Sequence, residues 1–170
     1  MIEGLTKLVE YNTKNIPYLS DGGCGRFGLY LYKHLVQLGI DVKIVAVDTY
    51  HEIKDTRKAI NKFHNFPNFE DGEGFSFLYS RIRAEGELKQ LLFETSFGHV
   101  LLYVKIDGKR YFIDGYNVYE DTPDEWFDHH NWGVITYQQL AISVAYGWWN
   151  KRYDVRNDRK LIEAIKLFVK

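Results

Sequence analysis

One predicted hairpin constrains the fold of this chain more than any other feature. Residues 98–106 and 109–114 are rich in Val, Ile, Leu and Tyr, as strands are, and Asp107-Gly108 separates them. Asp-Gly is a preferred pair for a two-residue type I′ turn, because both turn residues adopt a positive φ. Such a turn fixes the register, so we expect Ile106 to pair with Lys109 and pairing to proceed outward from there.

This register brings a histidine and a carboxylate together at the open end of the hairpin. Alternate residues of a strand share a face, so His99, Leu101 and Asp114 point the same way, and His99 and Asp114 are diagonal neighbours. A carboxylate bonded to one imidazole nitrogen leaves the other nitrogen able to take a thiol proton. The alternative is an exposed surface pair, which contributes little to stability. The opposite face of the hairpin is apolar and is the expected core face.

The single cysteine lies where a thiol is readily activated. Cys24 belongs to the glycine-rich segment 21–25, directly before an apolar helix predicted over residues 26–38 that ends at Gly39. The dipole and unpaired N–H groups of a helix start lower a thiol pKa and can hold an oxyanion. The alternative is an inert cysteine buried in a glycine turn. A single cysteine also excludes an internal disulfide and a multi-cysteine zinc site.

The remaining pattern predicts an α+β fold. Helices are expected over residues 2–13, 52–63, 84–94, 136–149 and 157–169, with strands over residues 40–47 and 75–79. Thr136 and Asn157 are the predicted N-caps of the last two helices. Helices first, then mostly antiparallel strands, then helices is an α+β order. A chain of 170 residues fits one domain spanning residues 1–170.

Composition excludes several classes of protein. With 45% hydrophobic and 26% charged residues, the chain is neither disordered nor a coiled coil. A net charge of −1 argues against a nucleic-acid or membrane-surface partner. The sequence shows neither a signal-peptide pattern nor a long apolar run, so we expect no transmembrane helix. Together with the lone thiol, this favours a cytoplasmic location.

The order of the cysteine, histidine and aspartate resembles the papain-like superfamily of thiol enzymes, most closely its transglutaminase-like branch. The matching motifs are Gly-Gly-Cys-Gly at 22–25, Leu-Gly-Ile at 38–40, Gly-His-Val at 98–100 and Tyr-Phe-Ile-Asp at 111–114. The resemblance implies a central helix packed on an antiparallel sheet, with extra helices at the C-terminus. It also implies that Cys24 is the nucleophile, that His99 is the general base and acid, and that Asp114 orients His99.

The chain departs from this family around the nucleophile. Gly25 stands where transglutaminases usually carry Trp, and the region before Cys24 lacks the Gln that donates to the oxyanion in papain proteases. The backbone N–H of Cys24 is the expected oxyanion donor, and Asn15 and Tyr18 are both candidates for a second. The residues expected to line the site are Tyr18, Asp21 and Gly23.

The resemblance implies a cysteine-dependent hydrolase that cleaves an amide in a protein or peptide-like substrate through an acyl-enzyme. Acyl transfer to an amine by the same acyl-enzyme is the first alternative. A catalytically inactive binding or inhibitory module, and an interaction protein in which the three residues never meet, are the others. We expect the residue ranges 48–74 and 115–135 to be loops that set specificity.

No metal or organic cofactor is expected. The run Asp128-His129-His130 looks metal-like, but adjacent histidines in an extended segment point apart. We expect His34, on the central helix, to be a packed or rim residue. Basic residues between positions 151 and 160 interleave with Asp154, Asp158 and Glu163, a pattern that predicts a solvated helix face.

Overall fold

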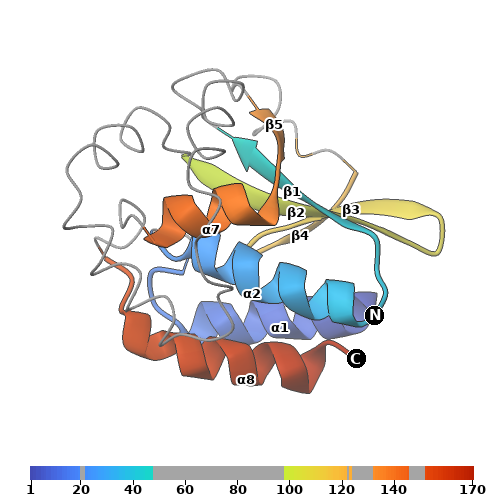
Figure 1. Ribbon diagram of the computed structural model, residues 1–170. Helices are drawn as coiled ribbons and strands as arrows, with labels where there is room; N and C mark the ends of the chain where they lie inside the picture. Colours follow the sequence, from blue (N-terminus) through green and yellow to red (C-terminus); the bar gives the residue numbers. More distant parts are fainter. Residues whose placement is uncertain (20–21, 48–97, 122, 124–131, 146–151) are drawn as a thin grey trace.

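Helices pack on one face of an antiparallel sheet (Figure 1). The computed structural model describes residues 1–19, 22–47, 98–121, 123, 132–145 and 152–170. The helices are α1 (Ile2–Asn15), α2 (Cys24–Gln37), α7 (Tyr137–Ala145) and α8 (Asp158–Phe168), and a 3₁₀ turn, η3 (Val155–Asn157), precedes α8. The strands are β1 (Val42–Val47), β2 (His99–Ile106), β3 (Lys109–Ile113), β4 (Val118–Glu120) and β5 (Trp132–Ile135). The predicted α+β class is therefore confirmed.

The strands lie in the order β4-β3-β2-β1-β5, and every neighbouring pair is antiparallel. The predicted hairpin is confirmed: Ile106 pairs with Lys109, and Asp107 and Gly108 have φ angles of 51° and 82°. Positive φ at both turn residues is the type I′ geometry. The range 115–135 was expected to be a loop, but it contains β4 and β5. These strands have only three and four residues, too few for a recognisable periodicity.

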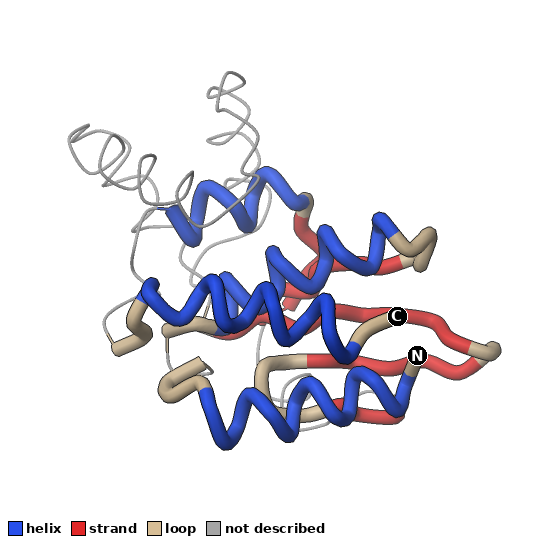
Figure 2. The backbone as a smooth tube through the Cα atoms, turned by 90° about the horizontal axis from the view of Figure 1, so that it is seen from below, coloured by secondary structure: helices blue, strands red, loops and turns tan. Residues whose placement is uncertain are grey.

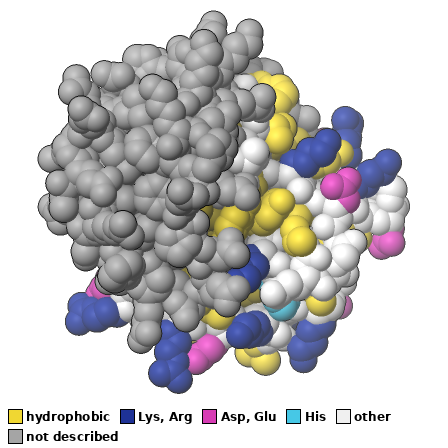
Figure 3. Space-filling view, in the orientation of Figure 1, with side chains coloured by type: hydrophobic (Ala, Val, Ile, Leu, Met, Phe, Trp, Pro, Cys, Tyr) yellow, Lys and Arg dark blue, Asp and Glu magenta, His cyan; other side chains and the backbone are white. Residues whose placement is uncertain are grey.

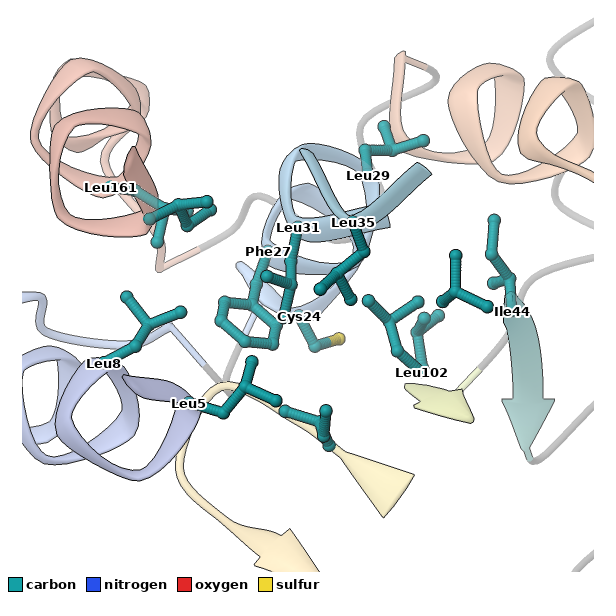
Figure 4. Close-up of a cluster of buried hydrophobic side chains, with 14 of the residues drawn as sticks. Leu5, Leu8, Cys24, Phe27, Leu29, Leu31, Leu35, Ile44, Leu102 and Leu161 are labelled. Atoms are coloured by element: carbon teal, nitrogen blue, oxygen red, sulfur yellow. The ribbon is translucent and has the colours of Figure 1, made fainter. Parts of the chain in front are cut away.

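Helix α2 lies at the centre of the core. Its buried side chains Phe27, Leu31 and Leu35 point between α1, α8 and the sheet (Figure 4). Figure 1 and Figure 2 show α1, α2 and α8 on the same side of the strands, and α8 packs against both α1 and α2. Side chains from these neighbours close the cluster: Leu5, Leu8, Ile44, Leu102 and Leu161. The expectation of a buried central helix is confirmed.

Two glycines set the position and the end of α2. At Gly28 a Cβ would lie 3.0 Å from Val100 Cγ1, so the absence of a side chain lets the helix approach β2 closely. At Gly39 the backbone is left-handed, with φ of 75°, and the N–H of Ile40 donates to the carbonyl of Leu35. This arrangement is a Schellman motif, and the predicted end of the helix at Gly39 is confirmed.

The face of the sheet away from the helices is apolar as well. Val45, Val47, Leu101 and Phe112 form a second buried cluster there. Only the helix-facing side of the hairpin had been expected to be a core face, so that expectation is corrected. Strand alternation places His99 on the same outer side as Leu101, at the end of β2.

Some of the other predicted helices and strands are confirmed, and others lie outside the described residues. The helices near both termini and the strand over residues 40–47 are confirmed, with ends within two residues of those expected except in α7, which the structure describes only as far as Ala145. Asn157 occupies the N-cap position of α8 but makes no side-chain cap hydrogen bond. The elements predicted over residues 52–63, 75–79 and 84–94 lie outside the described residues.

The described surface carries mixed charge. In Figure 3, Lys and Arg side chains are scattered over the visible face and interspersed with Asp and Glu, in keeping with the net charge of −1. Among the described helices, none has the length and apolar character needed to cross a bilayer.

Candidate active site

Cys24 is the first residue of α2, and glycines shape the turn that leads into it. Gly22 has a φ of 106°, a conformation that favours glycine, and Gly23 is the N-cap. A Cβ at Gly23 would lie 2.8 Å from the carbonyl oxygen of Leu19, so the turn has no room for a side chain there. The Cys24 side chain is therefore held at the helix start, where it is only 1% exposed.

His99 and Asp114 meet at the open end of the hairpin. His99 begins β2 and Asp114 directly follows β3. The Nε2 atom of His99 lies 3.1 Å from Oδ2 of Asp114, and the two residues are 5% and 3% exposed. The predicted pairing is confirmed, and the alternative of an exposed surface pair is wrong.

The Asp114 carboxylate is fixed by its own turn. Its Oδ1 accepts hydrogen bonds from the backbone N–H groups of Tyr116 and Asn117, both at 2.8 Å. The N–H of Asp114 donates to the carbonyl of Asn117 at 3.1 Å, which closes the turn. Because Oδ1 is occupied in this way, Oδ2 is held toward His99.

Two side chains that were not predicted complete this carboxylate's surroundings. The Tyr119 hydroxyl lies 3.5 Å from Oδ2 of Asp114, and the Asn117 side-chain amide donates to that hydroxyl at 3.0 Å. Both residues come from β4 or the turn before it. The available sequence signal was Asp114-Gly115, a pair that favours a turn after a strand.

The imidazole of His99 joins the carboxylate to the cysteine. Because Nε2 faces Asp114, Nδ1 is the ring nitrogen left for Cys24, whose side chain is near enough to raise the pKa of His99. Burial lowers the pKa of His99, but its hydrogen bond to Asp114, the proximity of Cys24 and the charges of both groups together outweigh that effect. The net effect raises the pKa of His99 to about 9. The protonated imidazolium is therefore the favoured form at neutral pH.

Comparisons with protein-family models, with curated proteins and with solved structures find no match for this chain. The geometry of Cys24, His99 and Asp114 is therefore the basis on which a function is assigned below.

A buried ionic cluster joins the start of α2 to the start of α8. The guanidinium of Arg26 donates to Oδ2 of Asp158, which also accepts from the Tyr30 hydroxyl at 2.9 Å. The Tyr153 hydroxyl donates to Oδ1 of Asp158 at 3.1 Å. Asp158 is only 3% exposed, so the expectation that it belongs to a solvated helix face is wrong. Its charge is buried because a buried cation, Arg26, lies against it.

Burial is the main influence on the protonation of the groups in this cluster. Burial raises the pKa of Asp158, although Arg26 and the two tyrosine hydroxyls favour the carboxylate and act in the opposite direction. Burial and the neighbouring carboxylate raise the pKa of both Tyr30 and Tyr153. Both phenols therefore stay protonated and remain hydrogen-bond donors to Asp158.

The residues expected to line the site differ in where the structure places them. Gly23 lies directly before Cys24, whereas Asp21 is outside the described residues. Tyr18 is 52% exposed in a left-handed conformation, with φ of 59°. The side-chain amide of Asn15 donates to the carbonyl of Tyr11 at 2.8 Å, so its donor is used within α1. Of the two candidates for a second oxyanion donor, the structure disfavours Asn15.

The sequence also led to a packing prediction for His34 and a prediction about metal binding by segment 128–130. His34 is half-buried at the rim of α2, with Nε2 2.8 Å from the carbonyl oxygen of Val169, and this confirms its structural interpretation. The segment 128–130 lies outside the described residues. Within the ranges that the structure describes, no cluster of three or more His, Cys, Asp or Glu side chains is placed to hold a metal ion.

Proposed function

We propose that this chain is a cysteine-dependent hydrolase that cleaves amide bonds in peptide-like substrates through an acyl-enzyme. One observation carries the proposal: the imidazole of His99 lies 3.1 Å from the buried carboxylate of Asp114 and near enough to the lone cysteine at a helix N-terminus for that cysteine to raise its pKa. A nucleophile, a base and a group that orients the base are the parts that covalent acyl transfer requires.

The raised pKa of His99 defines the reactive form. With a pKa of about 9, His99 holds its proton at neutral pH, and we propose that Cys24 reacts as the thiolate of a thiolate–imidazolium pair. In the first step Sγ forms a bond to the substrate carbonyl carbon, and the carbonyl electrons move to oxygen. The unpaired N–H groups at the start of α2, that of Cys24 among them, stabilise this oxyanion.

The remaining steps return the enzyme to its starting state. The oxyanion collapses and the C–N bond breaks while His99 gives its proton to the leaving amine, and a thioester of Cys24 remains. Neutral His99 then takes a proton from water as the water oxygen attacks the thioester carbonyl. The C–S bond breaks, the carboxylic acid leaves, and the thiolate–imidazolium pair is restored. Asp114 keeps Nε2 protonated and the ring in place throughout.

Acyl transfer to an amine is the second candidate. It shares the same thioester, and an amine takes the place of water in the second half. The near-complete burial of Cys24, His99 and Asp114 favours this candidate, because transfer to an amine requires water to be excluded from the thioester.

The test is the rate of Cys24 alkylation by iodoacetamide between pH 4 and 9. If the proposal is right, the wild type reacts rapidly well below the free-thiol pKa of about 8.5, and His99→Ala removes this low-pH reactivity. His34→Ala is the matched control, because it removes the other histidine described on a helix or strand, one on the rim of α2, and should leave the profile unchanged. A wild-type profile that follows a free thiol would instead favour a catalytically inactive module.

A further inference from the structure

The segment before α8 contacts the turn that carries the nucleophile. A Cβ built at Gly23 would lie only 2.5 Å from Cδ2 of Tyr153. The Tyr153 ring therefore packs directly against the backbone of the residue that precedes Cys24. Tyr153 is 3% exposed, so the contact is buried and excludes water.

The carboxylate of Asp158 is connected to the chain on both sides of Cys24. Asp158 accepts the Tyr153 hydroxyl at Oδ1 and the Arg26 guanidinium at Oδ2. Tyr153 contacts the residue before Cys24, and Arg26 lies two residues after it. Arg26 and Asp158 are 2% and 3% exposed, so both groups are fixed within the core. Asp158 thereby links the two flanks of Cys24 to the start of α8.

A helix start needs this kind of external support. The first N–H groups of a helix have no partners within it, and helix ends fray more readily than their centres. Cys24 occupies this first position, yet the proposed mechanism requires its sulfur to stay beside a histidine on a different element. A displacement of about 1 Å between reacting groups is enough to lower a rate by two orders of magnitude.

We propose that Tyr153, anchored by Asp158, is a positioning residue that holds Cys24 against His99; this inference rests on the proposed function. Tyr153 acts through the backbone of Gly23 and does not touch the reacting atoms. Its ring supplies the contact, and the hydrogen bond to Asp158 sets the orientation of the ring. The C-terminal segment that contains Tyr153 and α8 is thus a working part of the site as well as a part of the core.

The experiment compares alkylation of Cys24 by iodoacetamide at pH 6 and at pH 9 in the full chain. The ratio of the two rates reports the contact with His99, because a thiol without that contact reacts almost only at high pH. Tyr153→Ala removes the ring and is expected to lower the rate at pH 6 at least tenfold while changing the rate at pH 9 little. Tyr153→Phe keeps the ring against Gly23 but loses the hydrogen bond to Asp158, so its rate at pH 6 is expected to lie between those of the wild type and Tyr153→Ala.

Two matched variants separate positioning from loss of stability. Ile165→Ala removes a buried side chain of α8, and Tyr30→Phe removes another hydroxyl from the same carboxylate. Both are expected to lower the melting temperature and to keep the wild-type rate ratio. If Tyr153→Ala does not fold, Tyr153→Leu fills the core without a flat ring beside Gly23, and the same loss at pH 6 is expected.

The outcomes distinguish this inference from the proposed function. Folded Tyr153→Ala or Tyr153→Leu protein with the wild-type rate ratio would overturn the positioning role alone. An equal loss of the ratio in Ile165→Ala would overturn it too, because the effect would then follow stability. A wild type that reacts slowly at pH 6, with no dependence on His99, would overturn both this inference and the proposed function.

Discussion

At the scale of single residues, the account depends on how firmly one carboxylate is held. Asp114 accepts two backbone N–H groups at Oδ1 and faces His99 with Oδ2. A carboxylate in a fixed orientation stabilises an imidazolium far better than one that rotates, because its hydrogen bond to the ring is kept without an entropic cost. The charge of Asp114 and the orientation of its carboxylate should therefore both affect the pKa of His99.

Asp114→Asn tests the charge, because the variant keeps the shape of the side chain. We expect the pKa of His99 to fall by about one unit or more, since the hydrogen bond and charge that raise it are weakened. The rate of Cys24 alkylation at low pH should therefore fall. Asp107→Asn, in the exposed hairpin turn, is the matched control, since Asn tolerates the positive φ there. An unchanged alkylation profile in Asp114→Asn would remove Asp114 from the site.

At the scale of elements, the buried ion pair between α2 and α8 links parts of the chain that are distant in sequence. Arg26 and Asp158 are separated by 132 residues, and both are almost completely buried. Breaking a buried pair by removing one partner leaves an uncompensated charge and is strongly destabilising. Replacing both partners removes that penalty.

We therefore expect Arg26→Met to lower the free energy of unfolding by about 3–5 kcal/mol. The double variant Arg26→Met with Asp158→Asn should be less destabilised than Arg26→Met alone, because no buried carboxylate is left without its cation. Urea unfolding of the wild type, both single variants and the double variant measures the coupling between the two residues. Destabilisation equal to the sum of the two single variants would show that the pair is not coupled.

The elements also show what could be predicted from sequence and why the rest could not. The hairpin, its register and the meeting of His99 and Asp114 follow from local turn chemistry and strand alternation, so they were predictable. The short strands β4 and β5 carry too few residues for a pattern. The burial of Asp158 depends on a distant partner, so a charge pattern along α8 alone predicted a solvated position.

The hydrogen bonds around the site were likewise beyond a sequence reading. Tyr119 and Asn117 approach Asp114 only because the chain turns back into β4. Tyr153 contacts Gly23 across a separation of 130 positions along the chain. The catalytic candidates were thus predictable from motifs and spacing, whereas their supports depend on tertiary contacts.

At the scale of the whole molecule, the raised pKa of His99 makes stability depend on pH. A group whose folded-state pKa is raised contributes stability that is full below its unfolded pKa and is lost as pH rises through the folded value. For His99 these values are 6.5 and about 9. We expect the unfolding free energy of the wild type, relative to His99→Gln, to be largest near pH 6 and to fall by up to about 3 kcal/mol by pH 9.5. Urea unfolding at several pH values measures this; a difference that grows with pH would contradict it.

The most direct measurement is an NMR titration of the imidazole ring of His99 in protein labelled at histidine Cε1, with His99→Gln used to assign the signal. The account predicts a pKa of about 9 in the wild type. It predicts lower values in Cys24→Ala and in Asp114→Asn, because each variant removes a group that raises this pKa. A wild-type His99 that titrates near 6.5 or below, and is insensitive to both substitutions, would contradict the claim that cysteine, histidine and aspartate form one catalytic unit.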